Sequence, residues 1–361
     1  MSLISEDFLK EKQKYEKIAQ FTERHHWVPQ FYLRYFVTNK NDAQVFMYRP
    51  GSRATLVGVA NIATKKELYT FEECDGGGKT RVMEGVFSEH EGTVAPVIDK
   101  ILEEEVLPEN EIDRSHIAAF VSILRVRGPS FTDWLKNMEI EHLKLLQQIK
   151  AEHPDSLKKE FKEAGITFPS DEEFEEMRNF MRDPKRFTIE MKGGKGHYFK
   201  QAMELGEGLY NILMLEKSWH LLVAPQKRHF ITSDNPVVIQ ELHDCPPHLA
   251  GGFLNGTVLL TISPKYCLAF RRVPLQYPKI TLNREDVNHI NKSIANAARR
   301  QLYSHLDSKD FAILCNKYLS GNESKVSIKR LAKFALYYMS SGKHQFKESD
   351  TLKNSSSAFK H

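Results

Sequence analysis

The chain has 361 residues, which is enough for one large domain or two ordinary ones. Hydrophobic residues make up 41% of it and charged residues 27%, a balance typical of a globular chain and not of a disordered one. The formal net charge of +4 is compatible with a phosphate-bearing partner such as nucleic acid, but it is too small to require one.

The cysteines and the N-terminal residues exclude further classes of protein. Cys74, Cys245, Cys267 and Cys315 lie far apart without a CxxC pair, which argues against a zinc ribbon and a dense disulfide framework. Residues 1–21 are charged throughout and lack the apolar segment of a signal peptide. Because no run of about 18 apolar residues occurs, we expect a cytoplasmic protein with no membrane segment.

Hydrophobic spacing predicts a mainly helical first half. A charged helix is expected first, and then Pro29 in the first turn of a short aromatic helix. The helices expected in this half cover residues 5–20, 82–105 with a kink at Pro96, 110–127 and 130–152. The other elements expected are strands at 45–51 and 67–71 and a glycine-rich turn at 75–79.

The second half is richer in strands. Its expected elements are a charged helical insertion near 153–195, a helix near 197–216, strands within 218–225, 229–240 and 257–273, and helices at 284–300 and 308–319. This order predicts an α+β fold, with a helical N-terminal half packed on a mixed or mainly antiparallel sheet in a single large domain. The division expected is a helix at 1–22, a core at 23–305, C-terminal helices at 306–342 and a disordered tail at 343–361.

Several motifs follow one another in a fixed order along the chain. They comprise His26, Trp27, Pro29, Gln30, Leu33 and Phe36; Ala63, Glu67 and Tyr69; Glu84 and Glu91; Arg127 and Pro129; FITSDNPV at 230–237; and Asn288 and Asn291. With these motifs, residues 25–305 resemble the family called domain of unknown function 4238. The resemblance implies a bacterial protein and, through members found near defence genes, a link to defence. The acidic residues 153–195 depart from the family's pattern and indicate a private insertion.

Glu84 and Glu91 are candidates for metal binding. Seven residues separate them, so both carboxylates lie on one helix face, about 10.5 Å apart along the axis. One metal ion reaches both only if a side chain extends far. The alternative is structural, because a half-buried Glu84 needs a partner such as Arg34 or Arg127.

The TSDNP segment at 232–236 contains Asp234, a candidate for metal binding and catalysis. A strand end that presents Asp234 into a cleft suits a metal-dependent hydrolase, whereas a buried turn uses the same side chain to hold backbone amides. For Asn235 the turn is the better interpretation. Ser233 is a third possibility as a nucleophile, but no G-x-S-x-G motif surrounds it, and it would need a histidine and an acid nearby.

His26 is a candidate base or metal ligand, while His25 is expected to face solvent. The structural alternative for His26 is a helix cap or one hydrogen bond to a carboxylate. Arg125 and Arg127 lie two residues apart near a helix end and do not share a face. One of them could pair with Glu84, and the other could meet a phosphate.

Together these residues predict a metal-dependent phosphodiesterase, most simply a nuclease used in bacterial defence or as a toxin. In this hypothesis Asp234, Glu84 and Glu91 hold Mg²⁺ or Mn²⁺. Asp234 also belongs to the catalytic set with His26 as base and Arg127 as the group that stabilises the phosphate in the transition state. The alternative is a non-catalytic binding or regulatory protein whose polar motif residues only brace the fold.

Overall fold

A computed structural model of the chain describes residues 6–19, 23–39, 41–72, 78–190, 194–240 and 252–319. One compact unit covers Met1–Glu323. The predicted C-terminal tail, residues 75–77 of the glycine-rich turn and the stretch beyond residue 319 lie outside the described residues.

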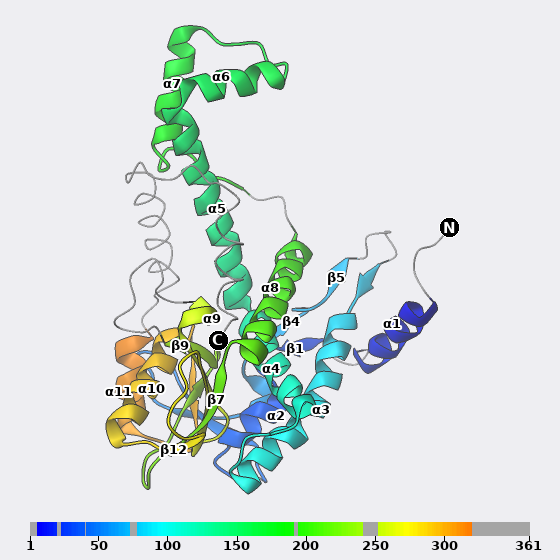
Figure 1. The fold of residues 1–361 in the computed structure, drawn as a ribbon, viewed down its shortest axis with the longest axis vertical. Coiled ribbons are helices and arrows are strands. Elements are labelled where there is room, and N and C mark those ends of the chain that lie inside the picture. Colours follow the sequence, from blue (N-terminus) through cyan, green and yellow to red (C-terminus); the bar gives the residue numbers. More distant parts are fainter. Residues whose placement is uncertain are drawn as a thin grey trace, which may run out of the picture. The chain divides into compact units, whose positions relative to one another are not determined.

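The helices follow the hydrophobic spacing closely (Figure 1). They are α1 (Glu6–Ala19), α2 (Gln30–Leu33), α3 (Val82–Glu104), α4 (Glu111–Val126), α5 (Pro129–Glu152), α6 (Pro154–Glu163), α7 (Asp171–Arg182), α8 (Lys195–Leu215), α9 (Gly252–Asn255), α10 (Arg284–Ala297) and α11 (Lys309–Tyr318), with short 3-10 turns at Arg34–Phe36 and Val59–Asn61. Two local signals agree with the observed bounds of α4 and α5. The Asn110 side chain accepts the Asp113 N–H and caps α4, and Pro129 occupies the first turn of α5.

A five-stranded sheet forms the centre of the second half. Its strands, in spatial order, are β12 (Lys279–Thr281), β7 (Ser218–Val223), β11 (Tyr266–Arg271), β10 (Thr257–Thr261) and β9 (Val237–Gln240). All neighbours are antiparallel except β12 and β7, which are parallel. The sheet is therefore mixed but mainly antiparallel, as predicted.

Strands from both halves of the chain form a second, four-stranded antiparallel sheet. Its order is β3 (Thr55–Gly58), β2 (Gln44–Tyr48), β13 (Leu302–Ser304) and β8 (Thr232–Ser233). Two small ribbons pair β1 (Arg24–His26) with β4 (Thr64–Lys66) and β5 (Phe71–Glu72) with β6 (Lys79–Thr80). The N-terminal half thus contributes strands as well as helices.

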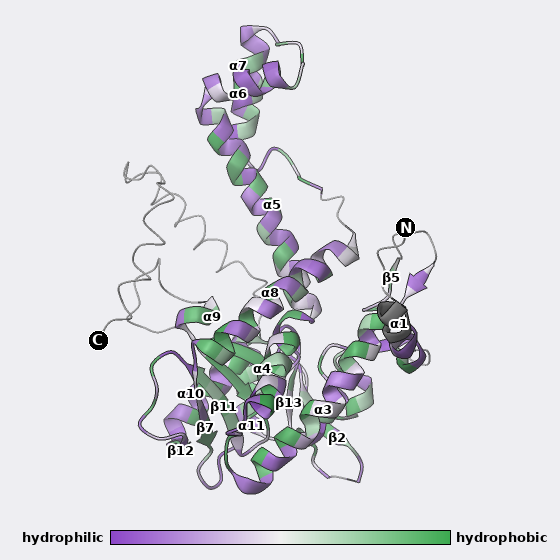
Figure 2. Cartoon of the chain, turned by 45° about the vertical axis from the view of Figure 1, so that its right-hand side comes forward, coloured by the Kyte–Doolittle hydropathy of each residue, from purple (hydrophilic) through white to green (hydrophobic). Residues whose placement is uncertain are grey.

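Both faces of the five-stranded sheet are covered, which explains its nearly continuous apolar strands. On β7, Leu221 and Val223 pack into a core cluster with residues of α2, α3, α4 and α8, whereas Leu222 packs on the opposite face with residues of α10 and α11. The strands are mainly hydrophobic in colour in Figure 2. This two-sided core confirms the predicted α+β class.

The strand predicted at 67–71 was wrong for residues 67–70. Residues 67–69 form a turn, because Glu67 takes a left-handed backbone conformation with φ +54°. The segment 229–240 does contain a strand, a turn and a strand, but β8 and β9 pair in different sheets. The turn between them carries Asp234 across the boundary between the two sheets.

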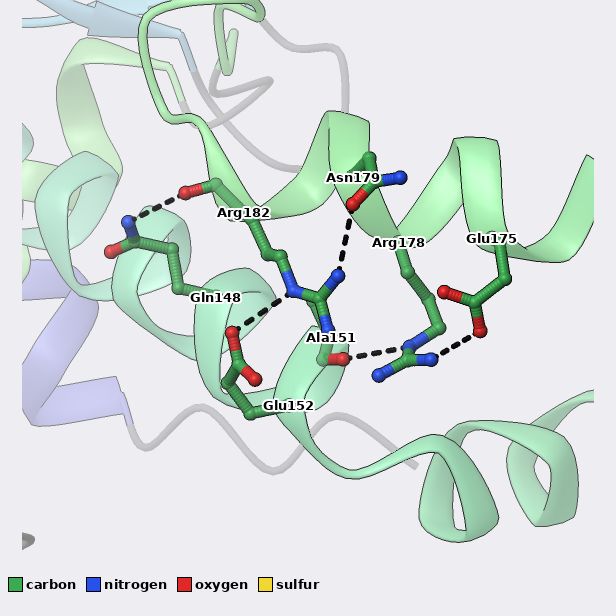
Figure 3. Close-up of polar contacts among 7 residues, drawn as sticks. All are labelled: Gln148, Ala151, Glu152, Glu175, Arg178, Asn179 and Arg182. Carbon is green, nitrogen blue, oxygen red and sulfur yellow. Dashed lines mark hydrogen bonds and ion pairs between the residues drawn. The ribbon is translucent and has the colours of Figure 1, made fainter.

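The charged residues after α5 form the predicted helical insertion, with its own small aromatic core. Phe161, Phe168 and Phe174 contact one another there. Figure 3 shows how α7 attaches to α5: Arg178 Nε donates to the Ala151 carbonyl at 2.8 Å, and Arg182 Nε contacts Glu152 at 3.0 Å. Arginine donors thus satisfy the last carbonyl and carboxylate groups of α5.

Among the described residues, no helix has both the length and the apolar character needed to cross a membrane.

Candidate functional site

Trp27 connects the aromatic motif to two other motifs. Its backbone N–H donates to the Ala63 carbonyl at 3.0 Å, next to the ribbon of β1 and β4. Its indole Nε1 donates to the backbone carbonyl of Asp234 at 2.8 Å, and its own carbonyl accepts from Arg127 Nε at 2.8 Å. Trp27 therefore lies between two residues that are more than 100 positions apart in the sequence.

Arg127 is the centre of the candidate site. It follows α4 as its C-cap, and only 3% of its surface is exposed. Its Nη1 donates to Glu91 Oε1 at 2.8 Å, and its carbonyl accepts from the Tyr69 hydroxyl at 3.1 Å. Its Nη2 is buried and has no hydrogen-bond partner. The guanidinium thus keeps one donor group for a further acceptor.

Glu84 and Glu91 both lie on α3 within range of the Arg127 charge, but their roles differ. Glu91 forms the ion pair with Arg127. No hydrogen bond or ion pair to the Glu84 carboxylate occurs among the described residues. Burial raises the pKa of Glu84 to about 7, against the opposing effect of Arg127 and with a further increase from Glu91. Glu84 can therefore exchange a proton near neutral pH.

The histidine of the aromatic motif that was expected to face solvent is the buried one. His25, predicted to face solvent, is fully buried: its Nδ1 accepts the Tyr69 N–H at 2.8 Å, and its ring stacks on Tyr69. The period of two in β1 explains this, because His25 and His26 point to opposite faces. His26 is partly exposed, and its Nε2 lies 3.2 Å from the Ala60 carbonyl. Burial, Arg127 and Arg24 lower the pKa of His26.

Asp234 holds backbone amides. Its Oδ1 accepts the Arg299 N–H at 2.8 Å and its Oδ2 accepts the Arg300 N–H at 2.9 Å. Both oxygens are therefore engaged in fixing the turn after α10, and the side chain is buried. Burial raises the pKa of Asp234 to about 6, although these hydrogen bonds oppose the increase. This geometry favours the structural interpretation of Asp234 over the catalytic one.

The side chains of the residues before and after Asp234 also form hydrogen bonds to the backbone. Ser233 is fully buried, and its Oγ accepts the Asn235 N–H at 3.1 Å. No histidine is bonded to Ser233 in the part of the chain that the structure describes, so the Ser233 hydrolase is dropped. The Asn235 Nδ2 donates to the Ala297 carbonyl at 2.8 Å, as expected of a turn residue.

The proposed metal ligands form a weak donor set. Within the described ranges, no group of three or more His, Cys, Asp or Glu side chains is arranged to hold a metal ion. Arg127 already pairs with Oε1 of Glu91, and backbone amides bind both oxygens of Asp234, so of these three acids only Glu84 has both carboxylate oxygens without a hydrogen bond among the described residues. These residues fit Mg²⁺ or Mn²⁺ poorly, because such ions need several oxygen ligands.

The sequence-based reasoning missed two histidines, His90 of α3 and His116 of α4, of which His90 lies within range of the Arg127 charge. His90 and His116 lie with ring centroids 6.4 Å apart, and the buried Nε2 of His90 has no partner. Burial, His116 and Arg127 lower the pKa of His90 to about 4. A helical signal could have found His116, because it precedes Arg127 by eleven residues, or about three turns, and so shares its face.

A basic ribbon lies next to the cluster. Arg24 of β1 pairs across the ribbon with Lys66 of β4, and Lys65 pairs with the buried His25. The side chains of Arg24, Lys65 and Lys66 are exposed. Arg24 and Lys66 therefore lie on the same face of the ribbon as His26, and Lys65 lies on the opposite face. The acid Glu23 contacts Lys66 at 3.3 Å.

The chain is thus an α+β protein with a cluster of carboxylates, histidines and one guanidinium between two helices. Its residues 24–308 match the model of the family described as Protein of unknown function (DUF4238). Since the match covers more than half of the chain, the protein belongs to this family, and the resemblance predicted from the motifs is confirmed. No curated protein and no solved structure matches the chain.

Proposed function

We propose that this protein hydrolyses phosphodiester bonds of nucleic acid, with Glu84 as the acid–base group and Arg127 as the phosphate-binding group. One observation carries the proposal. A half-buried carboxylate with no described hydrogen-bond partner lies near a buried guanidinium whose Nη2 is also unpaired. Structural ion pairs rarely leave both partners incomplete, because each unpaired buried group costs free energy.

The chemistry suits these two side chains. Arg127 Nη2 would donate to a phosphate oxygen, which positions the phosphorus and stabilises the charge that develops on it. Glu84 would take a proton from the attacking water and return it to the leaving oxygen, for which a pKa near 7 is well matched. His26, with its lowered pKa, would be neutral at pH 7 and could accept a proton. The exposed cations of β1 and β4 favour a polyanionic substrate.

The requirement for Mg²⁺ or Mn²⁺ stays a prediction. Because the residues present fit such an ion poorly, the roles proposed here for Glu84 and Arg127 do not depend on one. A role in bacterial defence or as a toxin belongs to the same proposal, because cleavage of nucleic acid serves both.

A specific observation also favours the non-catalytic alternative. Trp27, Arg127 and Asp234 bind one another through backbone groups, which is how residues that brace a fold behave. On this alternative the cluster would only recognise a ligand, and no substitution in it would change a turnover rate.

A cleavage assay separates the two functions. Wild-type protein, Glu84→Gln and the control Glu103→Gln would be incubated with RNA, single-stranded DNA and duplex DNA, in Mg²⁺, Mn²⁺ or EDTA. Glu103 is an exposed acid on the same helix. We expect cleavage by the wild type and Glu103→Gln, and a loss of at least about 100-fold in Glu84→Gln.

Equal activity in Glu84→Gln would refute the role of Glu84. The absence of cleavage by the folded wild type with every substrate and metal would leave the binding protein as the better description. Cleavage that EDTA abolishes would support the predicted metal ion.

A further inference from the structure

Arg125 faces a different environment from Arg127. The two residues are two positions apart, which rotates them by about 200° around the helix axis. Arg127 contacts Trp27 and α3, whereas Arg125 points toward the turn before β9. Its Nη1 makes two long contacts of 3.4 Å there, to Asn235 Oδ1 and to the Val237 carbonyl.

The other edge of the Arg125 guanidinium is unpaired. Nε is buried and has no hydrogen-bond partner, and Nη2 has none among the described residues. Nε and Nη2 form the edge that binds the two oxygens of a phosphate or carboxylate side by side. The free donors of Arg125 are therefore arranged as a bidentate pair.

Among the described residues, no carboxylate balances this charge. Arg125 makes no ion pair within the described ranges, whereas the Arg299 side chain nearby pairs with Asp133 at 2.8 Å. The groups around the Arg125 guanidinium include the rings of Phe131 and Phe253, at 5.9 and 6.0 Å from Cζ. Burial lowers the pKa of Arg125 to about 10, so the side chain keeps its charge at neutral pH.

The Arg125 side chain as a whole is half-buried, but its buried Nε lacks a hydrogen-bond partner, which is costly, and an anionic ligand bound at this edge would remove that cost. Phosphate fits better than a single halide ion, since two oxygens can meet Nε and Nη2 together. The aromatic rings on either side would exclude water from the ion and strengthen the pairing.

We propose that Arg125 binds a phosphate group through Nε and Nη2, at a site bounded by Asn235, Phe131 and Phe253. The site lies on the opposite side of the end of α4 from Glu84 and Arg127. The inference does not rest on the proposed hydrolase, because it follows from the pairing of Arg125 alone.

Inorganic phosphate is the probe. Melting temperature and calorimetric binding would be measured for the full chain with sodium phosphate and, at equal ionic strength, with sodium chloride or sodium acetate. The variants are Arg125→Met, which removes the charge, Arg125→Lys, which keeps the charge but not the paired donors, and the control Arg299→Gln.

We expect phosphate to raise the melting temperature of the wild type and of Arg299→Gln more than chloride does. Arg125→Met should lose this additional stabilisation by phosphate. In chloride it should be no less stable than the wild type. Arg125→Lys should bind phosphate at least about tenfold more weakly. If acetate stabilises the wild type as much as phosphate does, the ligand is a carboxylate and the phosphate assignment is overturned.

Two further outcomes would overturn the proposal. One is a wild type that phosphate stabilises no more than chloride does. The other is Arg125→Lys with unchanged phosphate affinity, a result that stays decisive if Arg125→Met fails to fold. An inactive hydrolase would leave all these measurements unaffected.

Discussion

Glu84 links stability to pH at the scale of a single residue. Below about pH 4.5 its carboxyl is neutral in both the folded and the unfolded chain. Because the folded pKa is about 7, ionisation at higher pH favours the unfolded chain, and stability is lost as the pH rises through 7. We predict that Glu84→Gln matches the wild type near pH 4 and exceeds its free energy of unfolding above pH 7 by up to about 3 kcal/mol.

Urea unfolding of both proteins across this pH range measures the difference. The histidines with lowered pKa values titrate in the same interval but are present in both proteins, so the difference between the two curves isolates Glu84. If Glu84 were half of a structural ion pair with Arg127, the glutamine variant would be the less stable protein above pH 7, and the predicted sign would be wrong.

Substitution of Asp234 should instead destabilise the protein, because removal of its carboxylate leaves two partly buried N–H donors unpaired. Asp234→Ala exposes no cleft but deprives the N–H groups of Arg299 and Arg300 of their acceptors. We predict a loss of at least about 2 kcal/mol in the free energy of unfolding. Asp133→Ala, which removes the exposed acid paired with the Arg299 side chain, should cost less than about 1 kcal/mol. Equal losses in the two variants would contradict the structural role of Asp234.

At the scale of elements, one glycine controls how two helices pack. A Cβ on Gly85 of α3 would lie 2.3 Å from the Tyr15 carbonyl oxygen of α1. Gly85→Ala therefore forces α1 away from α3, and we predict a loss of about 1 to 3 kcal/mol and faster amide hydrogen exchange over residues 6–19.

Gly92 of the same helix is the matched control. A Cβ there meets nothing within 4 Å, so Gly92→Ala should stabilise the protein by about 0.4 to 1 kcal/mol. If exchange in α1 increased equally in both variants, the close contact at Gly85 would not be what positions α1.

The sequence predicted helices better than strand pairing, for a physical reason. The 3.6-residue spacing and the caps of α4 and α5 are local, so their bounds were found within a residue or two. The turn at Glu67 and the separation of β8 from β9 depend on partners far away in the chain. Nothing within residues 229–240 indicates that its two strands join different sheets.

The candidate site shows the same limit. Spacing placed Glu84 and Glu91 on one helix, and burial predicted a charge partner such as Arg127 for Glu84. In the structure Arg127 pairs with Glu91 instead, and Glu84 makes no ion pair among the described residues. The sequence could not show that the amides after α10 would engage Asp234. A carboxylate in a turn has the same sequence signature whether it faces a cleft or the backbone.

At the scale of the whole molecule, the helical insertion is separable from the core. The first turns of α5 pack with α8 through Leu135, whereas Ala151 near its end contacts the insertion. The Gln148 side chain donates to the Arg182 carbonyl at 3.0 Å, so the two ends of the insertion lie close together. A short connection can therefore replace residues 154–181 without pulling on α5 or α8.

We predict that a linker of about four Gly and Ser residues in this place lowers the melting temperature by no more than about 4 °C. Leu213 is fully buried in the core next to the five-stranded sheet. Leu213→Ala should therefore lower the free energy of unfolding by about 2 to 5 kcal/mol and lower the melting temperature much more than the linker does. Thermal unfolding of both proteins tests this. The aromatic residues of the insertion pack among themselves, so its removal should leave the main core intact. If the protein without residues 154–181 has a melting temperature as low as that of Leu213→Ala, the insertion contributes to the main core and the prediction is wrong.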